Sequence, residues 1–153
     1  MLEARSQLAS HIKPGRYGAG GSPSVTLSEV RGRSIVQVAG WPDTFDSVSK
    51  GLAAAAGGTV PNAFGIASVA DTVTVIWTGA ERLWFTADDP ALMKRFDGVA
   101  TDEDAMLLDL SDSRTILRLK GEAARSVLIK GIAVDLHTDA FPVQAIAHTT
   151  VEH

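Results

Sequence analysis

One stretch of the chain, residues 111–137, constrains the fold more than any other part of the sequence. Apolar and polar side chains alternate over residues 115–120, which is the period of two that is typical of a β-strand. Gly121 and Glu122 then turn the chain, and small and apolar residues recur near helical spacing as far as Gly131. The stretch therefore predicts a strand, a turn and a helix, and by itself it holds no catalytic constellation.

Strands outnumber helices in the rest of the chain and come in adjacent pairs. Alternating or short apolar runs predict strands over residues 25–30, 34–39, 66–69, 72–77, 82–86, 106–110 and 144–151. One helix is predicted after the capping residue Asp43, with its end at Gly57. A second is predicted after Asp89, with its end at Gly98. This order favours an α+β fold with mixed, mainly antiparallel sheets, helices on one face and ferredoxin-like βαββαβ elements.

The length of the chain and its first residues predict a simple domain organisation. A chain of 153 residues fits one domain. Residues 1–24 include the Gly- and Pro-rich run RYGAGGSPS, so we expect an extended N-terminal arm there. Residues 25–153 are then expected to form a single α+β domain.

Composition excludes several classes of function. The net charge is −4 and the basic residues are scattered, which argues against a nucleic-acid surface. There are no cysteines, so disulfides and cysteine metal sites are excluded. The N-terminus lacks the apolar run of a signal peptide, and no apolar stretch approaches the roughly 20 residues of a membrane span. We therefore expect a cytoplasmic protein that contacts neither nucleic acid nor membrane.

The residues that can carry chemistry do not combine into a catalytic set. Two acidic clusters, Asp88–Asp89 and residues 102–104, fall in predicted turns, where solvated caps are a better interpretation than acid–base catalysis. No two of the four histidines have metal-ligand spacing, and His137 is predicted to bond locally in a turn. The sequence contains neither G-x-S-x-G nor a dinucleotide-binding fingerprint. We therefore predict no catalytic, cofactor-binding or metal-binding residue in this chain.

Aromatic and basic side chains are better candidates for contact with a partner protein. Trp41 and Trp84 are interpreted as interface anchors, because buried aromatic residues dominate the energetics of many interfaces. Arg114 and Arg118 lie four residues apart on one predicted strand and hence on one face of it. They are expected to pair with acidic groups of this chain or of a partner. The predicted partner interface therefore consists of Trp41, Trp84, Arg114 and Arg118.

Several segments carry a family resemblance. The pattern SDSRTILRLKGEAARSVLIKGIAVDLH, followed by AFPVQAIAHT, resembles the gamma subunit of heterotetrameric sarcosine oxidase. The segments MLEARSQLASHI, VTLSEVRGRSIVQVAGWPD and RLWFTA resemble the same family in the same order. Relative to that pattern, the chain is expected to lack the family's C-terminal strand and helix.

The resemblance implies a fold, a reaction and a set of partners. The fold is similar to the folate-binding domains of aminomethyltransferases. The complex oxidises sarcosine to glycine and produces hydrogen peroxide and methylene-tetrahydrofolate. FAD, FMN, NAD, tetrahydrofolate and zinc are expected in the alpha, beta and delta subunits and none of them in this chain.

The resulting prediction is a gamma-type subunit of an oxidoreductase that contributes no catalytic residue. It would pack on the large, folate-carrying alpha subunit, in a complex whose substrate range the sequence leaves open. One alternative is a stand-alone folate-binding or one-carbon transfer protein. Another is a regulatory domain that forms homodimers through its sheet edges.

Overall fold

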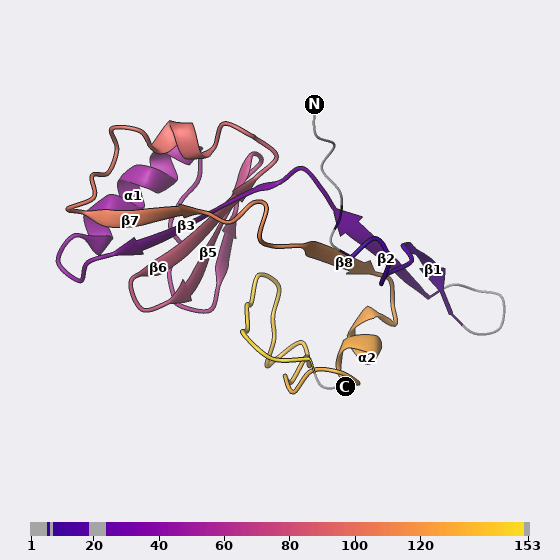
Figure 1. Cartoon of the computed structure of the whole chain (residues 1–153). Coiled ribbons are helices and arrows are strands. Elements are labelled where there is room, and N and C mark those ends of the chain that lie inside the picture. Colours follow the sequence, from indigo (N-terminus) through magenta and orange to yellow (C-terminus); the bar gives the residue numbers. More distant parts are fainter. Residues whose placement is uncertain (1–5, 7, 19–23, 152–153) are drawn as a thin grey trace, which may run out of the picture. The chain divides into compact units, whose positions relative to one another are not determined.

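The computed structural model describes residue 6, residues 8–18 and residues 24–151, and the chain divides into two compact units. Unit 1 consists of residues 1–31, 114–136 and 149–153, and unit 2 consists of residues 32–113 and 137–148. Each unit contains its own β-sheet (Figure 1). The predicted boundary at residue 24 and the single domain after it stay predictions, but the division into two units was not anticipated.

Unit 2 is built on a five-stranded sheet in which all paired strands are antiparallel, in the order β4-β5-β6-β3-β7. Its strands are β3 (Ser34–Gly40), β4 (Ala67–Val69), β5 (Val73–Gly79), β6 (Arg82–Ala87) and β7 (Ala105–Asp109). The helix α1 (Phe45–Ala56) follows β3, and the short 3-10 helix η1 (Met93–Phe96) follows β6. With β4 as an added edge strand, the succession β3-α1-β5-β6-η1-β7 and its strand order match the ferredoxin-like pattern. The predicted α+β class is confirmed.

The core of unit 2 lies between one face of this sheet and the two helices (Figure 1). Alternation along the strands directs every second side chain to this face, where the strands contribute Val36, Val38, Val73, Val75, Leu83 and Phe85. α1 presents Val48 and Leu52 at helical spacing, and η1 presents Phe96. The rings of Phe85 and Phe96 meet edge to face with centroids 5.1 Å apart, so the short η1 is held by aromatic packing.

The helix ends differ in part from the sequence expectation. α1 ends as predicted at Gly57, whose φ of 79° is the left-handed conformation that glycine adopts without steric cost. Its N-cap is Thr44 and not Asp43, and the Thr44 hydroxyl donates to the backbone oxygen of Asp104 at 2.6 Å. The second helix is only a 3-10 turn. Asp89 does cap this region, because its carboxylate accepts the amide of Ala91 at 2.8 Å.

Unit 1 contains a three-stranded antiparallel sheet in the order β1-β2-β8, followed by a short helix. Its elements are β1 (Gly15–Tyr17), β2 (Val25–Val30), β8 (Ile116–Lys120) and α2 (Ala124–Leu128). β1 therefore forms a sheet strand within the predicted arm, whose residues 1–5, 7 and 19–23 lie outside the described part of the chain. The strand–turn–helix prediction for residues 111–137 is confirmed, although α2 has five residues only.

The predicted last strand, residues 144–151, is wrong. This segment makes only two isolated bridges, Ile66 with Ala145 and Ile132 with Val151. These bridges belong to different units, and Gln144 has a φ of 71°, which interrupts an extended strand. In the described part of the chain, no helix is long and apolar enough to cross a membrane.

Candidate partner-binding surface

Trp84 lies on the face of the unit 2 sheet opposite the core, which we call the second face. Strand register places Ile76, Trp84, Gln37 and Leu108 side by side across β5, β6, β3 and β7. The Trp84 indole N–H donates to Oε1 of Gln37 at 3.0 Å, and the exposed His148 ring meets the indole edge to face at a centroid distance of 6.3 Å. The indole is therefore half-buried, oriented by a hydrogen bond and still partly open to solvent.

The second face continues as an apolar surface on the edge strand β7. Met106 is 54% exposed and Leu108 is 45% exposed. In the strand register Met106 lies opposite Ala39, and Leu108 lies opposite Gln37 beside Trp84. Large apolar side chains exposed on the same sheet face as a tryptophan are typical of protein–protein contact surfaces.

Trp41 is the most exposed of the three tryptophans, and hydrogen bonds hold its backbone in a turn. The residue is 52% exposed and lies in the turn between β3 and α1. Its carbonyl accepts the amides of Thr44 at 3.1 Å and Phe45 at 2.8 Å, so the turn is tied to the start of α1. The third tryptophan, Trp77, packs against Phe45 at the core, with centroids 5.8 Å apart.

Arg114 and Arg118 lie in unit 1, whereas both candidate tryptophans lie in unit 2. Arg118 stands on β8 opposite Ser28 and is exposed. Arg114 is also exposed, but β8 begins at Ile116, so strand alternation does not extend to Arg114. The role of Trp41, Trp84, Arg114 and Arg118 at an interface stays a prediction.

The acidic clusters serve as turns and caps. Asp104 accepts two hydrogen bonds from Thr101, from the hydroxyl at 2.7 Å and the amide at 3.0 Å, and the hydroxyl bond is the main reason why the pKa of Asp104 is lowered. Asp109 has a lowered pKa because it accepts the hydroxyl and amide of Ser111. Asp89 forms an ion pair with Arg95 at 2.7 Å. The lowered pKa values of Asp104 and Asp109 favour their ionised forms, which suits a structural role better than that of a general acid.

His137 also occupies a turn. Its carbonyl accepts the amides of Ala140 at 3.1 Å and Phe141 at 2.7 Å, and its imidazole lies 3.4 Å from the Asp139 carboxylate. Among the described residues, no group of three His, Asp or Glu side chains could hold a metal ion.

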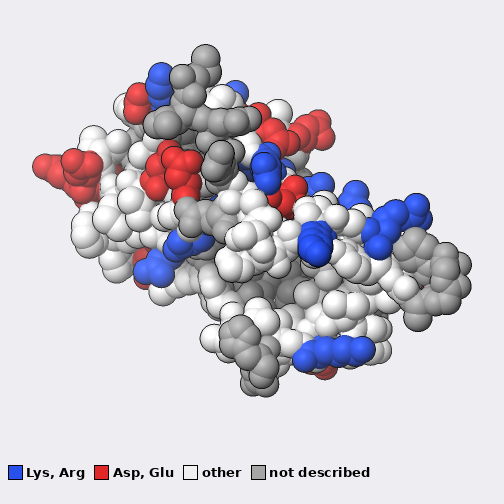
Figure 2. Space-filling view, turned by 45° about the vertical axis from the view of Figure 1, so that its right-hand side comes forward, with Lys and Arg blue, Asp and Glu red and all other residues white. Residues whose placement is uncertain are grey.

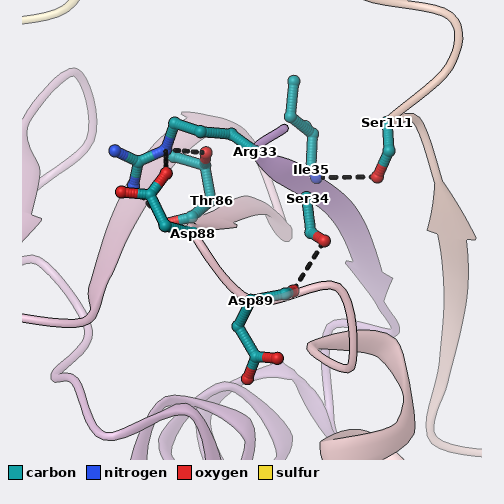
Figure 3. A network of polar contacts seen from close by, with 7 residues as sticks. All are labelled: Arg33, Ser34, Ile35, Thr86, Asp88, Asp89 and Ser111. Carbon is teal, nitrogen blue, oxygen red and sulfur yellow. Dashed lines mark hydrogen bonds and ion pairs between the residues drawn. The ribbon is translucent and has the colours of Figure 1, made fainter. Parts of the chain in front are cut away.

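Arg33 is a structural residue that no sequence pattern singled out, because it lies between the two strands predicted over residues 25–30 and 34–39. Its guanidinium donates to the hydroxyl and the carbonyl of Thr86, both at 3.1 Å, and lies 3.5 Å from the carboxylate of Asp88 (Figure 3). Next to it, the Ser34 hydroxyl donates to the backbone oxygen of Asp89 at 2.7 Å. These contacts join the start of β3 to the end of β6, at one wall of a polar cavity of about 520 Å³.

Unit 1 carries an apolar groove of about 320 Å³. It lies on the sheet face that bears Val25 and Leu27, and its other apolar lining residues are Tyr17, Leu119 and Val127. In the described part of unit 1 only Val25 and Leu136 reach the burial of core apolar residues. The unit therefore leaves much of its apolar surface open, and no sequence pattern singled out this groove.

The comparisons with known proteins decide the family. The chain is 31% identical to the sarcosine oxidase subunit gamma of Corynebacterium sp. (strain U-96), over 97% of this chain and 74% of that protein. The chain belongs to the sarcosine oxidase gamma subunit family. The gamma subunit of an Arthrobacter species is 30% identical to it, over 96% of this chain and 72% of that protein. No protein-family model matches the chain.

The fold of the gamma subunit family is also found in a solved structure. The heterotetrameric sarcosine oxidase from Corynebacterium sp. U-96, in complex with pyrrole 2-carboxylate, contains a chain that superposes with a TM-score of 0.77. The two chains are 31% identical, and the match covers 94% of this chain and 73% of that chain. The resemblance drawn from residues 111–137 is therefore confirmed.

Proposed function

We propose that this chain is the gamma subunit of a heterotetrameric sarcosine oxidase. The observation that carries the proposal is the 31% identity to a gamma subunit over 97% of the chain. The TM-score of 0.77 against a chain of a heterotetrameric sarcosine oxidase supports the same assignment. In this role the chain assembles with alpha, beta and delta subunits and packs directly on the large alpha subunit. We also propose a cytoplasmic location, which cell fractionation would test.

The reaction of the proposed complex converts sarcosine, oxygen and tetrahydrofolate to glycine, hydrogen peroxide and methylene-tetrahydrofolate. FAD, FMN, NAD, tetrahydrofolate and zinc belong to the partner subunits in this proposal, and this chain supplies no catalytic residue. The geometry of the acidic clusters agrees with this division. Asp89 and Asp104, which sequence spacing offers for acid–base chemistry, bind backbone amides and a neighbouring arginine or threonine.

The surface that supports a packing role is on unit 2. Trp41 is exposed on a fixed turn. Trp84 is oriented by Gln37, which lies between Trp84 and the exposed Leu108 in the strand register, and Met106 is exposed further along β7. Aromatic side chains that are rigid before binding lose little conformational entropy on association, and they are frequent binding hot spots.

Co-expression with the alpha, beta and delta subunits tests the proposal. A tag on this chain should recover all four subunits as one species by light scattering. Trp41→Ala and Trp84→Ala should each lower the recovered complex by about tenfold or more, the effect of losing a hot spot worth about 2 kcal/mol. Phe64→Ala is the matched control, because Phe64 is an aromatic residue of unit 2 that is 63% exposed.

Two results would contradict the proposal. In the first, the tagged wild-type chain is recovered without the other subunits. In the second, the purified chain binds tetrahydrofolate stoichiometrically by calorimetry, which would favour a stand-alone folate-binding protein.

A further inference from the structure

Three cationic side chains share one face of the unit 1 sheet. In the strand register, Thr26 of β2 lies opposite Arg16 of β1 and opposite Lys120 of β8. Ser28, two residues further along β2, lies opposite Arg118 of β8. Residues paired across antiparallel strands, and residues two apart on a strand, point to the same face. The same face continues at its end with the half-buried pair Val30 and Ile116. We call the part formed by Arg16, Thr26, Ser28, Arg118 and Lys120 the basic face.

The cations of the basic face are close together. Residues two apart on a strand are separated by roughly 7 Å and neighbouring strands by roughly 5 Å, so Arg118 and Lys120 are roughly 7 Å apart. Arg16 and Lys120, on either side of Thr26, are roughly 10 Å apart. All three cationic side chains are exposed. In Figure 2 several Lys and Arg side chains stand on white, uncharged surface.

No carboxylate of the sheet offsets this charge. Glu29 is the one acidic residue of the three strands, and alternation places it with Leu27 on the opposite, apolar face. There it is bound to Arg31 at 2.9 Å. Within the described residues, none of the three cations makes an ion pair with a carboxylate. Like charges at this spacing repel one another, and an anionic partner would relieve the repulsion.

The two units of the chain carry net charges of opposite sign. Unit 1 contains nine Lys and Arg against five Asp and Glu, a net charge of +4. Unit 2 contains five against thirteen, a net charge of −8. The whole chain therefore has a negative net charge of −4, although unit 1 by itself is basic.

We propose that the basic face docks on an acidic surface of a partner subunit in the sarcosine oxidase complex. This inference rests on the proposed function and assigns a second contact to it, in addition to the tryptophan surface of unit 2. The composition of the face favours protein over other anions. Three cations separated by Thr and Ser on a flat sheet fall short of the roughly four to eight that bind anionic lipid. The face also lacks the aromatic side chains on which single-stranded nucleic acid stacks.

The physical role of such a face is to guide assembly. Complementary charge raises the rate of encounter and fixes orientation more than it raises affinity, and salt weakens it. The side-chain hydroxyls of Thr26 and Ser28 can accept or donate hydrogen bonds between the charged groups. The face therefore fits a partner surface on which carboxylates alternate with small polar residues.

The test places a variant in competition with the wild-type chain. Tagged Arg118→Glu/Lys120→Glu and untagged wild-type chains are co-expressed with the alpha, beta and delta subunits, and mass spectrometry gives their ratio in the isolated complex. The variant should be incorporated at about one tenth of the wild-type level or less, in keeping with the range of electrostatic rate effects. The neutral pair Arg118→Gln/Lys120→Gln should fall between the two.

Lys94→Glu/Lys130→Glu is the matched control. It changes the net charge by the same amount at two exposed lysines outside the basic face, one in each unit. It should be incorporated nearly as well as the wild-type chain. Hydrogen exchange over β2 and β8 verifies that each variant keeps its sheet.

The outcomes separate this inference from the proposed function. If the wild-type chain enters no complex, the proposed function fails and this inference with it. If the wild-type chain assembles and the Arg118/Lys120 variant is incorporated equally well, only the basic-face inference fails. An equal loss of incorporation in the Lys94/Lys130 control would indicate a general effect of net charge and would overturn the basic-face inference. Retention of the purified wild-type chain on a DNA fragment or on anionic vesicles, lost in the variant while assembly is normal, would also overturn it.

Discussion

Gly121 is the residue whose substitution should damage unit 1 most directly. It follows β8 and has a φ of 123°, a backbone conformation that side chains with a Cβ rarely adopt. A Cβ at this position would overlap the carbonyl oxygen of Ser24 and lie 2.9 Å from its carbonyl carbon and 3.2 Å from Cα of Val25. These neighbours are backbone atoms beside β2, so the pairing of β2 with β8 must shift to accept Gly121→Ala.

The expected loss of free energy in Gly121→Ala has two parts, which a control variant can separate. Gly98 has a φ of 74°, and a Cβ added there would have no neighbour within 4 Å. Gly98→Ala therefore adds only the strain of a left-handed backbone. The net loss of stability is about 1 kcal/mol, because the lower conformational entropy of the unfolded variant offsets part of the strain. Gly121→Ala adds to such strain a backbone overlap, and forced shifts of this kind cost about 1–3 kcal/mol more. We therefore expect the free energy of opening β2 and β8 to fall by about 3 kcal/mol.

Native-state hydrogen exchange measures each unit by itself. Amides of β2 and β8 should exchange about 100-fold faster in Gly121→Ala, because each 1.4 kcal/mol is about a factor of ten. Those of β3 and β6 should be unchanged. Intrinsic tryptophan fluorescence should also be unchanged, because all three tryptophans are in unit 2. The reasoning is refuted if Gly121→Ala costs unit 1 no more than Gly98→Ala costs unit 2.

Three further predictions concern unit 2. Phe96→Ala should lower the free energy of unfolding of unit 2 by about 3–5 kcal/mol, because Phe96 is 1% exposed. A urea titration followed by tryptophan fluorescence measures this change. Phe64→Ala, at an exposed residue, should change it by less than about 0.5 kcal/mol. Arg33→Lys should cost about 1–2 kcal/mol in the same titration, because lysine cannot reproduce the paired bonds to Thr86; an equal cost for Asp88→Asn, at an exposed carboxylate, would contradict this role. Asp104 has a lowered pKa in the folded state, so it stabilises the fold above the pKa of the unfolded chain and loses this effect as pH falls through the folded pKa. Asp104→Ala should therefore destabilise the fold at about pH 6 and destabilise it less at about pH 3, below the ordinary pKa of Asp; an equal effect at both pH values would contradict the assignment.

The sequence predicts best those elements whose signal is local. The alternation of Val36 and Val38, and the helical spacing of Val48 and Leu52, identify β3 and α1 because each pattern reports burial on one side. The α+β class follows from the succession of these elements, whereas the division into a five-stranded and a three-stranded sheet was not predicted. The family followed from the segment around β8, where residue types and spacing are most specific.

The sequence fails where distant partners decide the conformation. Residues 144–151 alternate like a strand, but Ala145 and Val151 form bridges in different units. Arg33 reads as a turn residue, and only the fold brings Thr86, 53 positions away, within reach of its guanidinium. The candidate tryptophans and arginines are divided between the two units, and this division has no local signal in the sequence.

The pattern that identifies β8 as a strand also explains why unit 1 has two different faces. Leu117 and Leu119 alternate with Arg118 and Lys120, so one face is apolar and the other is basic. A shift of one residue in the pairing of β8 with β2 would exchange these faces and bury two cations against the apolar groove. In the observed register the end of β8 approaches the backbone of Ser24 so closely that only glycine fits at position 121. Gly121→Ala should therefore also lower incorporation into the complex, through loss of the basic face, although Gly121 itself carries no charge. Normal incorporation of Gly121→Ala, with hydrogen exchange showing that β2 and β8 are unpaired in most molecules, would mean that the basic face is not needed for assembly.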